Sequence, residues 1–196
     1  MRKFFGFVAV LMISGASAQI NSKGTVELVP LVGYSSANYY GDITTANSEI
    51  SGVNFGVAAD YYFNDQWSLR SGAFYQTMGT QFGADEDRLK YVTIPVNANW
   101  HFSKNRRWNL NFGPSFGFLS SAESTINGVK IDLDGFVETF QLGLNIGIGY
   151  KIEISQKFSL LIDYQAMAGL TKVADFENVD LKNTYGSLNV GGVLKL

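Results

Sequence analysis

The sequence predicts an all-β fold, an eight-stranded antiparallel up-and-down transmembrane β-barrel. Three observations lead to this prediction. Apolar residues alternate with glycine and polar residues, most clearly in Ser51–Phe63, and the alternation recurs in about eight segments. The connections between these segments are alternately short and long. No later segment has the roughly 20 consecutive apolar residues of a helical span. Because lipid cannot satisfy free backbone groups, a membrane protein without helices must close its sheet.

The first 18 residues have the pattern of a cleaved secretory signal peptide. Arg2 and Lys3 precede an apolar run from Phe4 to Ile13, and an Ala-Ser-Ala cleavage sequence ends at Ala18. The alternative is a short membrane anchor, but the run is too short to span a bilayer core of about 30 Å. We therefore expect residues 1–18 to be removed and residues 19–196 to form one barrel domain.

Composition agrees with a barrel and argues against several other functions. The chain has 21 glycines, 15 phenylalanines, 10 tyrosines and only 16% charged residues. Without Arg2 and Lys3 the 15 basic residues become 13, against 17 acidic residues, so the formal net charge of the mature chain is about −4. This balance argues against nucleic acid as a partner. The absence of cysteine excludes disulfides, and a single histidine offers no zinc site. We expect no cofactor.

The alternation places eight strands and three short turns, which are Asn64–Gln66, Ser103–Arg107 and Glu153–Lys157. The strands are Thr25–Tyr34, Ser51–Phe63, Trp67–Met78, Leu89–Phe102, Trp108–Leu119, Phe140–Ile152, Phe158–Leu170 and Tyr185–Leu196. Short turns at one end and long loops at the other are typical of bacterial outer-membrane barrels. The long loops are Ser35–Ile50, Gly79–Arg88, Ser120–Thr139 and Thr171–Thr184. Pro30, Pro95 and Pro114 fall inside strands, where we expect β-bulges.

The predicted outward faces are apolar and end in aromatic residues beside each short turn. In Leu89–Phe102, for example, the outward face runs from Val92 to Phe102, whereas the inward face of the next strand consists of asparagine, glycine and serine from Asn109 to Gly117. Aromatic girdles at the headgroup level are typical of membrane barrels. The alternative is a set of strand-end aromatics in a soluble core. The predicted girdle consists of Tyr61, Phe63, Trp67, Trp100, Phe102, Trp108, Tyr150 and Phe158.

Several short motifs resemble a known family. The segments Tyr91–Val96 and Phe112–Leu119 resemble an "x-I-P-L" strand followed by a "G-P-x-x-G" strand, and Gly147–Tyr150 and Phe158–Tyr164 resemble two further family segments. The chain is thus similar to the outer-membrane β-barrel proteins of Gram-negative bacteria labelled porin-family or PorT-like. The resemblance implies an eight-stranded barrel in the outer membrane, with the bilayer and the barrel-insertion machinery as partners. The final residue is Leu196, where such barrels usually end in an aromatic residue.

Six charged residues are predicted to point into the lumen near the short turns. We expect Asp60 to lie opposite Arg70, Lys195 to approach Glu27, and Lys151 to neighbour Asp163. Buried charges need partners, so we interpret this set as a charge-balanced network that plugs a narrow lumen. The alternative is an ion path. The network consists of Glu27, Asp60, Arg70, Lys151, Asp163 and Lys195.

The sequence predicts no catalytic residue. His101 faces inward near Ser103, and a His–Ser pair could carry out acyl chemistry, but a hydrogen-bonded lumen histidine is the favoured interpretation. The long loops carry acidic residues such as Asp85–Asp87, which are interpreted as a solvated face, with divalent-cation binding as the alternative. We expect a non-enzymatic barrel with a structural or interaction role through long acidic extracellular loops and an unknown extracellular or envelope protein partner. The alternatives are a narrow passive pore and a lipid-modifying enzyme.

Overall fold

The computed structural model describes residues 20–42, 47–174 and 179–196. These residues form eight long strands and two short ones. The strands are β1 (Val26–Gly41), β2 (Asn47–Ser48), β3 (Ile50–Tyr62), β4 (Trp67–Phe82), β5 (Asp85–Phe102), β6 (Trp108–Ile126), β7 (Val129–Asp132), β8 (Phe140–Glu153), β9 (Phe158–Gly169) and β10 (Leu181–Lys195). Within the described ranges, no helix has the length and apolar character needed to cross a membrane. The predicted signal peptide lies outside these ranges and stays a prediction.

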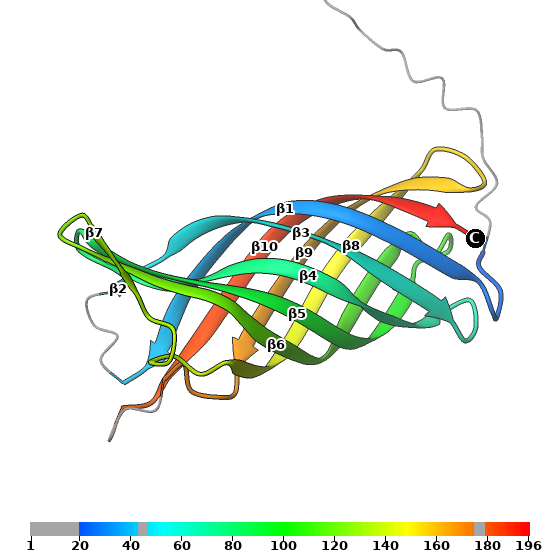
Figure 1. Cartoon of the computed structure of the whole chain (residues 1–196). Helices are drawn as coiled ribbons and strands as arrows, with labels where there is room; N and C mark the ends of the chain where they lie inside the picture. The colour runs from blue at the N-terminus through cyan, green and yellow to red at the C-terminus, as the bar shows by residue number, and fades with distance from the viewer. Residues whose placement is uncertain (1–19, 43–46, 175–178) are drawn as a thin grey trace, which may run out of the picture.

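The eight long strands close into one antiparallel barrel, which confirms the predicted fold class. Each long strand pairs with its neighbours along the chain, and β1 pairs with β10 to close the cylinder. The short strands lie beside it, since β2 pairs with β4 and β7 pairs with β6. The short connections and the C-terminus share one end, here named the turn end, while the β6–β7 hairpin projects at the opposite loop end (Figure 1).

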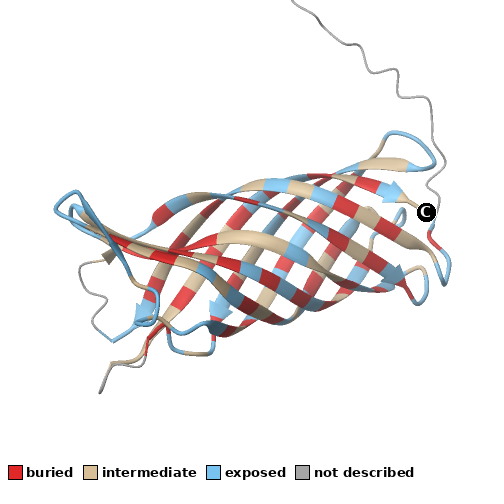
Figure 2. Ribbon diagram, in the orientation of Figure 1, coloured by how far each residue is buried: buried red, intermediate tan, exposed pale blue. Residues whose placement is uncertain are grey.

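Burial alternates along the strands with the period that the sequence predicts. On β3, Val53 is 60% exposed and its neighbour Asn54 only 1%. Figure 2 shows the same alternation of buried and exposed bands around the barrel. Glycines on the inward face leave space for large side chains, because a Cβ at Gly56 would overlap the ring of Phe74. The wall is therefore apolar outside, while its interior is filled by side chains.

Toward the loop end, the apolar residues change from the outward to the inward face of the strands. On β5 the outward residue Val92 is followed toward the loop by the charged residues Lys90 and Arg88, while the inward residues Tyr91 and Leu89 are buried. This part of the barrel is therefore built like a water-soluble barrel, with its apolar residues inside. The ends of β4 beyond Met78 and of β5 before Leu89 were missed by the sequence prediction, because the apolar face of the strands is the opposite one here.

Strands consequently extend into all four of the predicted long loops. Gly79–Arg88 is wrong as a loop, because β4 and β5 continue to a tight turn at Gly83, whose φ of +61° favours glycine. The acidic run Asp85–Asp87 lies in β5. Part of Ser120–Thr139 forms the β6–β7 hairpin, and β1 and β10 extend into the other two predicted loops.

The three prolines do not produce the expected bulges. Pairing keeps the same register across Pro30, Pro95 and Pro114. In the β5–β6 pairing the register shift falls instead between Lys90 and Tyr91, where the apolar face changes sides. A proline removes only its own ladder hydrogen bond, and the neighbouring pairs hold the strands in place.

Candidate functional site

The first layer of the lumen, at the turn end, is a buried cluster around Glu27. Glu27 Oε2 accepts hydrogen bonds from Tyr62 Oη at 2.8 Å and from Lys151 Nζ at 2.9 Å. Its other oxygen accepts a bond from Asn21 Nδ2 at 2.7 Å. Lys151 Nζ also donates to Tyr62 Oη at 2.8 Å. The strands β1, β3 and β8 thus hold one carboxylate, one ammonium and one phenol in mutual contact across the barrel.

The second layer lies further into the lumen and is centred on Arg70. Arg70 donates from Nε and Nη2 to the two oxygens of Asp60, at 3.0 and 2.8 Å, and its Nη1 lies 3.5 Å from Asp163. Side-chain amides complete the shell, with Asn99 donating to Asp60 at 3.1 Å and Asn189 to Asp163 at 2.8 Å. Since these groups are buried, the amides supply bonds that water would otherwise provide.

Of the three expected charge pairs, one forms, one brings its residues together only at the backbone, and one is offset along the strands. Asp60 and Arg70 are directly opposite across β3 and β4. Lys195 is the backbone partner of Glu27 across β1 and β10, but the ammonium that contacts Glu27 belongs to Lys151. Lys151 is opposite Leu161 on β9, and Asp163 is opposite Gly149, so the expected Lys151–Asp163 neighbourhood is offset by two residues.

His101 is enclosed between the two layers. Its side chain is 0% exposed, its Nε2 lies 2.9 Å from Ser68 Oγ, and its Nδ1 lies 3.5 Å from Tyr62 Oη. Its ring stacks on Tyr62 with centroids 4.6 Å apart. The hydroxyl partner is therefore Ser68 of β4 rather than Ser103. Among the described residues there is no group of three or more His, Cys, Asp or Glu side chains placed to hold a metal.

A third layer, the apolar plug, fills the barrel at the loop end. Its buried members come from most of the strands, and Val173 of the β9–β10 connection joins them. A small cavity of about 40 Å³ lies between the apolar plug and the Arg70 layer. The plug consists of Ala37, Tyr39, Ile50, Met78, Leu89, Tyr91, Ala122, Met167, Val173 and Tyr185.

Aromatic rings form a continuous outer row across four strands at the turn end. Trp67 and Trp100 have centroids 6.3 Å apart, Trp100 and Phe102 4.9 Å, and Phe102 and Trp108 6.2 Å. Tyr150 extends the row at 4.9 Å from Trp108. The other predicted girdle residues are nearby, with Tyr61 and Phe63 packed edge to face and Phe158 at the start of β9.

The apolar belt on the outside has the height of a bilayer core. On β5 it extends from Val92 to Phe102, which is about 33 Å of strand at about 3.3 Å per residue. For a strand tilted by about 40°, this corresponds to about 25 Å along the barrel axis, the height of the apolar band in membrane barrels.

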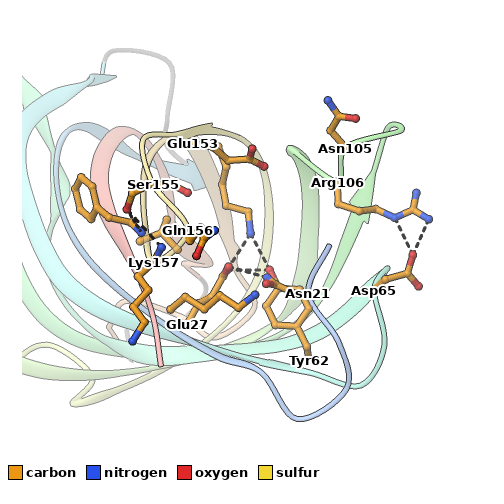
Figure 3. Close-up of a pocket in the computed structure, with 15 residues that line it drawn as sticks. Asn21, Glu27, Tyr62, Asp65, Asn105, Arg106, Glu153, Ser155, Gln156 and Lys157 are labelled. Carbon is orange, nitrogen blue, oxygen red and sulfur yellow. Dashed lines mark hydrogen bonds and ion pairs between the residues drawn. The ribbon is translucent and has the colours of Figure 1, made fainter. Parts of the chain in front are cut away.

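A pocket of about 310 Å³ opens at the turn end, beneath the Glu27 layer. Figure 3 shows Glu27 and Tyr62 together in this pocket and Arg106 paired with Asp65 at its side. Arg107, in the adjoining turn, lies 3.1 Å from Glu153. Hydrogen bonds to Glu153 and Tyr150 raise the pKa of the Arg107 guanidinium above its ordinary value.

Two lumen contacts were missed by sequence reasoning, that of Tyr62 with Glu27 and that of Asn99 with Asp60, although the strand positions of these residues contain the signal. Tyr62 lies two residues after Asp60 and thus on the same face, and Asn99 lies two residues before His101. Asn127-Gly128, with φ values of +51° and +79°, forms the tight turn between β6 and β7. An Asn-Gly pair between alternating segments is a strong hairpin signal, and it was present in the sequence.

The closed wall, the outward apolar belt and the filled lumen define an outer-membrane β-barrel protein. The chain belongs to the family described as "Outer membrane protein beta-barrel domain", whose profile matches residues 17–175. No curated protein sequence matches it significantly.

Solved structures of three bacterial outer-membrane proteins have a similar fold. Neisserial surface protein A (NspA) is 18% identical, with a TM-score of 0.57 over 89% of this chain and 100% of the other. OprG from Pseudomonas aeruginosa is 12% identical, with a TM-score of 0.55 over 91% and 99%. Ail, the attachment invasion locus protein of Yersinia pestis, is 14% identical, with a TM-score of 0.50 over 89% and 99%, in a complex with the heparin analogue sucrose octasulfate. At these identities the likeness concerns the fold alone.

Proposed function

We propose that this protein is a plugged, non-conducting barrel with a structural or interaction role at its loop end. The observation that carries the proposal is that three successive layers of side chains fill the lumen, two of them polar and one apolar. A hydrated path would have to pass Glu27, Arg70 and Leu89 in turn. The first two are held in ion pairs, and the third is 0% exposed within the apolar plug.

The surface of the loop end supports an interaction role. Phe136 is 69% exposed and Val129 63%, and both lie beyond the outward apolar belt. Exposed apolar groups of this kind, surrounded by charged residues, are typical of protein-binding surfaces. The acidic groups around them include Asp132 and Asp134, while Glu123 is already paired with Lys130 at 3.1 Å. Two acidic residues of the predicted loop, Asp175 and Glu177, lie outside the described residues.

The experiment for the proposal is conductance of the refolded protein in a planar bilayer. We expect no steady open-channel current in potassium chloride. Heat-modifiable gel mobility should verify that the barrel is folded in the same preparation. A stable current carried by the folded, unmodified protein would contradict the plugged lumen and favour the narrow passive pore.

We further propose that the barrel is not an enzyme. A lipid-modifying enzyme needs a reactive group that its substrate can reach, whereas His101 and Ser68 are both enclosed by the wall and the Glu27 layer. Mass analysis of outer-membrane lipids from cells with and without the gene should give the same lipid species. A lipid that disappears with the gene and returns with it, but not with His101→Ala, would contradict this proposal.

The proposed location and partners follow from the same barrel. We propose that the mature chain is delivered by a cleaved signal peptide and inserted into the outer membrane by the barrel-insertion machinery. The proposed loop-end partner is an extracellular or envelope protein. Crosslinking on intact cells from a residue introduced in place of Phe136 should trap it, whereas the same residue in place of Lys104 at the turn end should not. Equal products from both positions would argue against a loop-end partner.

A further inference from the structure

The pocket at the turn end has a charge imbalance that points to a ligand. Three carboxylates line it, and each is already paired within the protein. Glu27 pairs with Lys151 at 2.9 Å, Asp65 with Arg106 at 2.8 Å, and Glu153 with Arg107 at 3.1 Å. A further anion would thus meet neutralised carboxylates rather than free ones.

Two lysines of the same pocket have no such partner. Lys157 and Lys195 both line it, and no carboxylate in the described part of the chain lies within 4.0 Å of either ammonium. Their backbones are adjacent, because the N–H of Lys195 donates to the carbonyl of Lys157 at 3.0 Å. The seam between the β8–β9 turn and the end of β10 therefore supplies two uncompensated positive charges to one cavity.

The pocket is closed from the lumen, so that its occupant has to enter from the turn end. Its inner boundary includes Glu27, Tyr62 and Lys151, which bind one another. In barrels of this class the short turns face the periplasm. A blind cavity of about 310 Å³ accommodates a small molecule or the end of a chain, at the lower limit of usual ligand pockets.

We propose that this pocket binds a carboxylate, such as the C-terminal end of a periplasmic peptide, through Lys157 and Lys195. A carboxylate matches the available donors, since two separate ammonium groups can each bind one of its oxygens. The guanidinium of Arg106, which also lines the pocket, is already engaged with Asp65, so the two lysines are the cations left to bind the anion.

The test measures binding of trialanine, with its free carboxylate, to the refolded protein in a neutral detergent by NMR titration. We expect saturable shifts at residues of the pocket, and no comparable shifts with trialanine amide. Lys195→Gln and Lys157→Gln should each weaken binding by about tenfold or more, the effect of one charge-assisted hydrogen bond. Lys104→Gln removes a charge from the same end outside the pocket and should leave the affinity unchanged.

Other results would overturn the proposal. Equal binding of trialanine and its amide would show that the carboxylate is not recognised. An equal loss of affinity in Lys104→Gln would show that trialanine is held by general attraction between charges and not by the two lysines of the pocket. Tighter binding of inorganic phosphate than of trialanine would assign the pocket to a different anion. Two variants at separate positions are included because Lys195 lies next to the C-terminus, and gel mobility should confirm that each variant is folded.

Discussion

Arg70 binds both carboxylate oxygens of Asp60, from Nε at 3.0 Å and from Nη2 at 2.8 Å, inside a barrel whose outer surface is apolar. The two side chains are directly opposite across β3 and β4. This two-point geometry fixes the orientation of both groups and leaves Nη1 directed toward Asp163. One cation thus joins carboxylates from strands on different sides of the lumen.

Arg70→Ala should destabilise the barrel without opening it. Removal of one partner from a buried ion pair leaves the other charge uncompensated, so we expect a loss of roughly 3–5 kcal/mol in the free energy of unfolding. Urea unfolding in phospholipid vesicles, followed by tryptophan fluorescence, measures this loss. As a control, Arg88→Ala removes a more exposed partner of Glu86 and should cost at most about 1 kcal/mol. A conductance that appears in folded Arg70→Ala would argue against the plug.

Two substitutions in the Glu27 layer should distinguish the contribution of the ion pair to stability from that of the Tyr62 hydroxyl. Glu27→Gln leaves the buried Lys151 ammonium without its carboxylate and should cost roughly 3–5 kcal/mol. Tyr62→Phe keeps the ion pair and removes only a hydroxyl with two partners, for roughly 1–3 kcal/mol. The same unfolding assay compares them, and a larger loss for Tyr62→Phe than for Glu27→Gln would show that the ion pair is not the main stabilising contact of this layer.

Leu89→Ala tests the apolar plug. Leu89 is fully buried in it, and truncation of a buried leucine costs roughly 2–5 kcal/mol. Its neighbour Lys90 faces outward above the apolar belt, so Lys90→Ala should change the stability by less than about 0.5 kcal/mol. Unfolding curves give both values. Equal and small losses would mean that the loop end is not a packed core.

A charge introduced on the outer belt should be costly only within the belt. Ile146 faces outward near the middle of the belt on β8, so Ile146→Arg should cost roughly 2–4 kcal/mol for folding into vesicles. Ser121→Arg, above the belt on β6, should be nearly neutral. If the two substitutions have the same effect, the outward apolar residues do not mark the membrane-spanning region.

The sequence predicted the closed barrel and the inward and outward faces of its strands because the alternation is strong where the outside is apolar. The position of Arg70 opposite Asp60 follows from pairing across a short hairpin and was predicted. The contact between Lys151 and Glu27 crosses the lumen, and a pattern along single strands does not specify which inward side chains meet there. The ends of β4 and β5 were missed for another reason, since beyond Val92 the apolar residues change faces and the period remains the same.

The pairing of β1 with β10 has a consequence for assembly. The first and last strands of the chain close the cylinder, with Glu27 opposite Lys195. Until the C-terminal segment has left the export machinery, the nascent wall has two unsatisfied edges that can recruit foreign strands. Closure of the barrel therefore depends on the last strand of the chain. A chain that ends before β10 lacks the partner of β1 and is not expected to close into a smaller barrel.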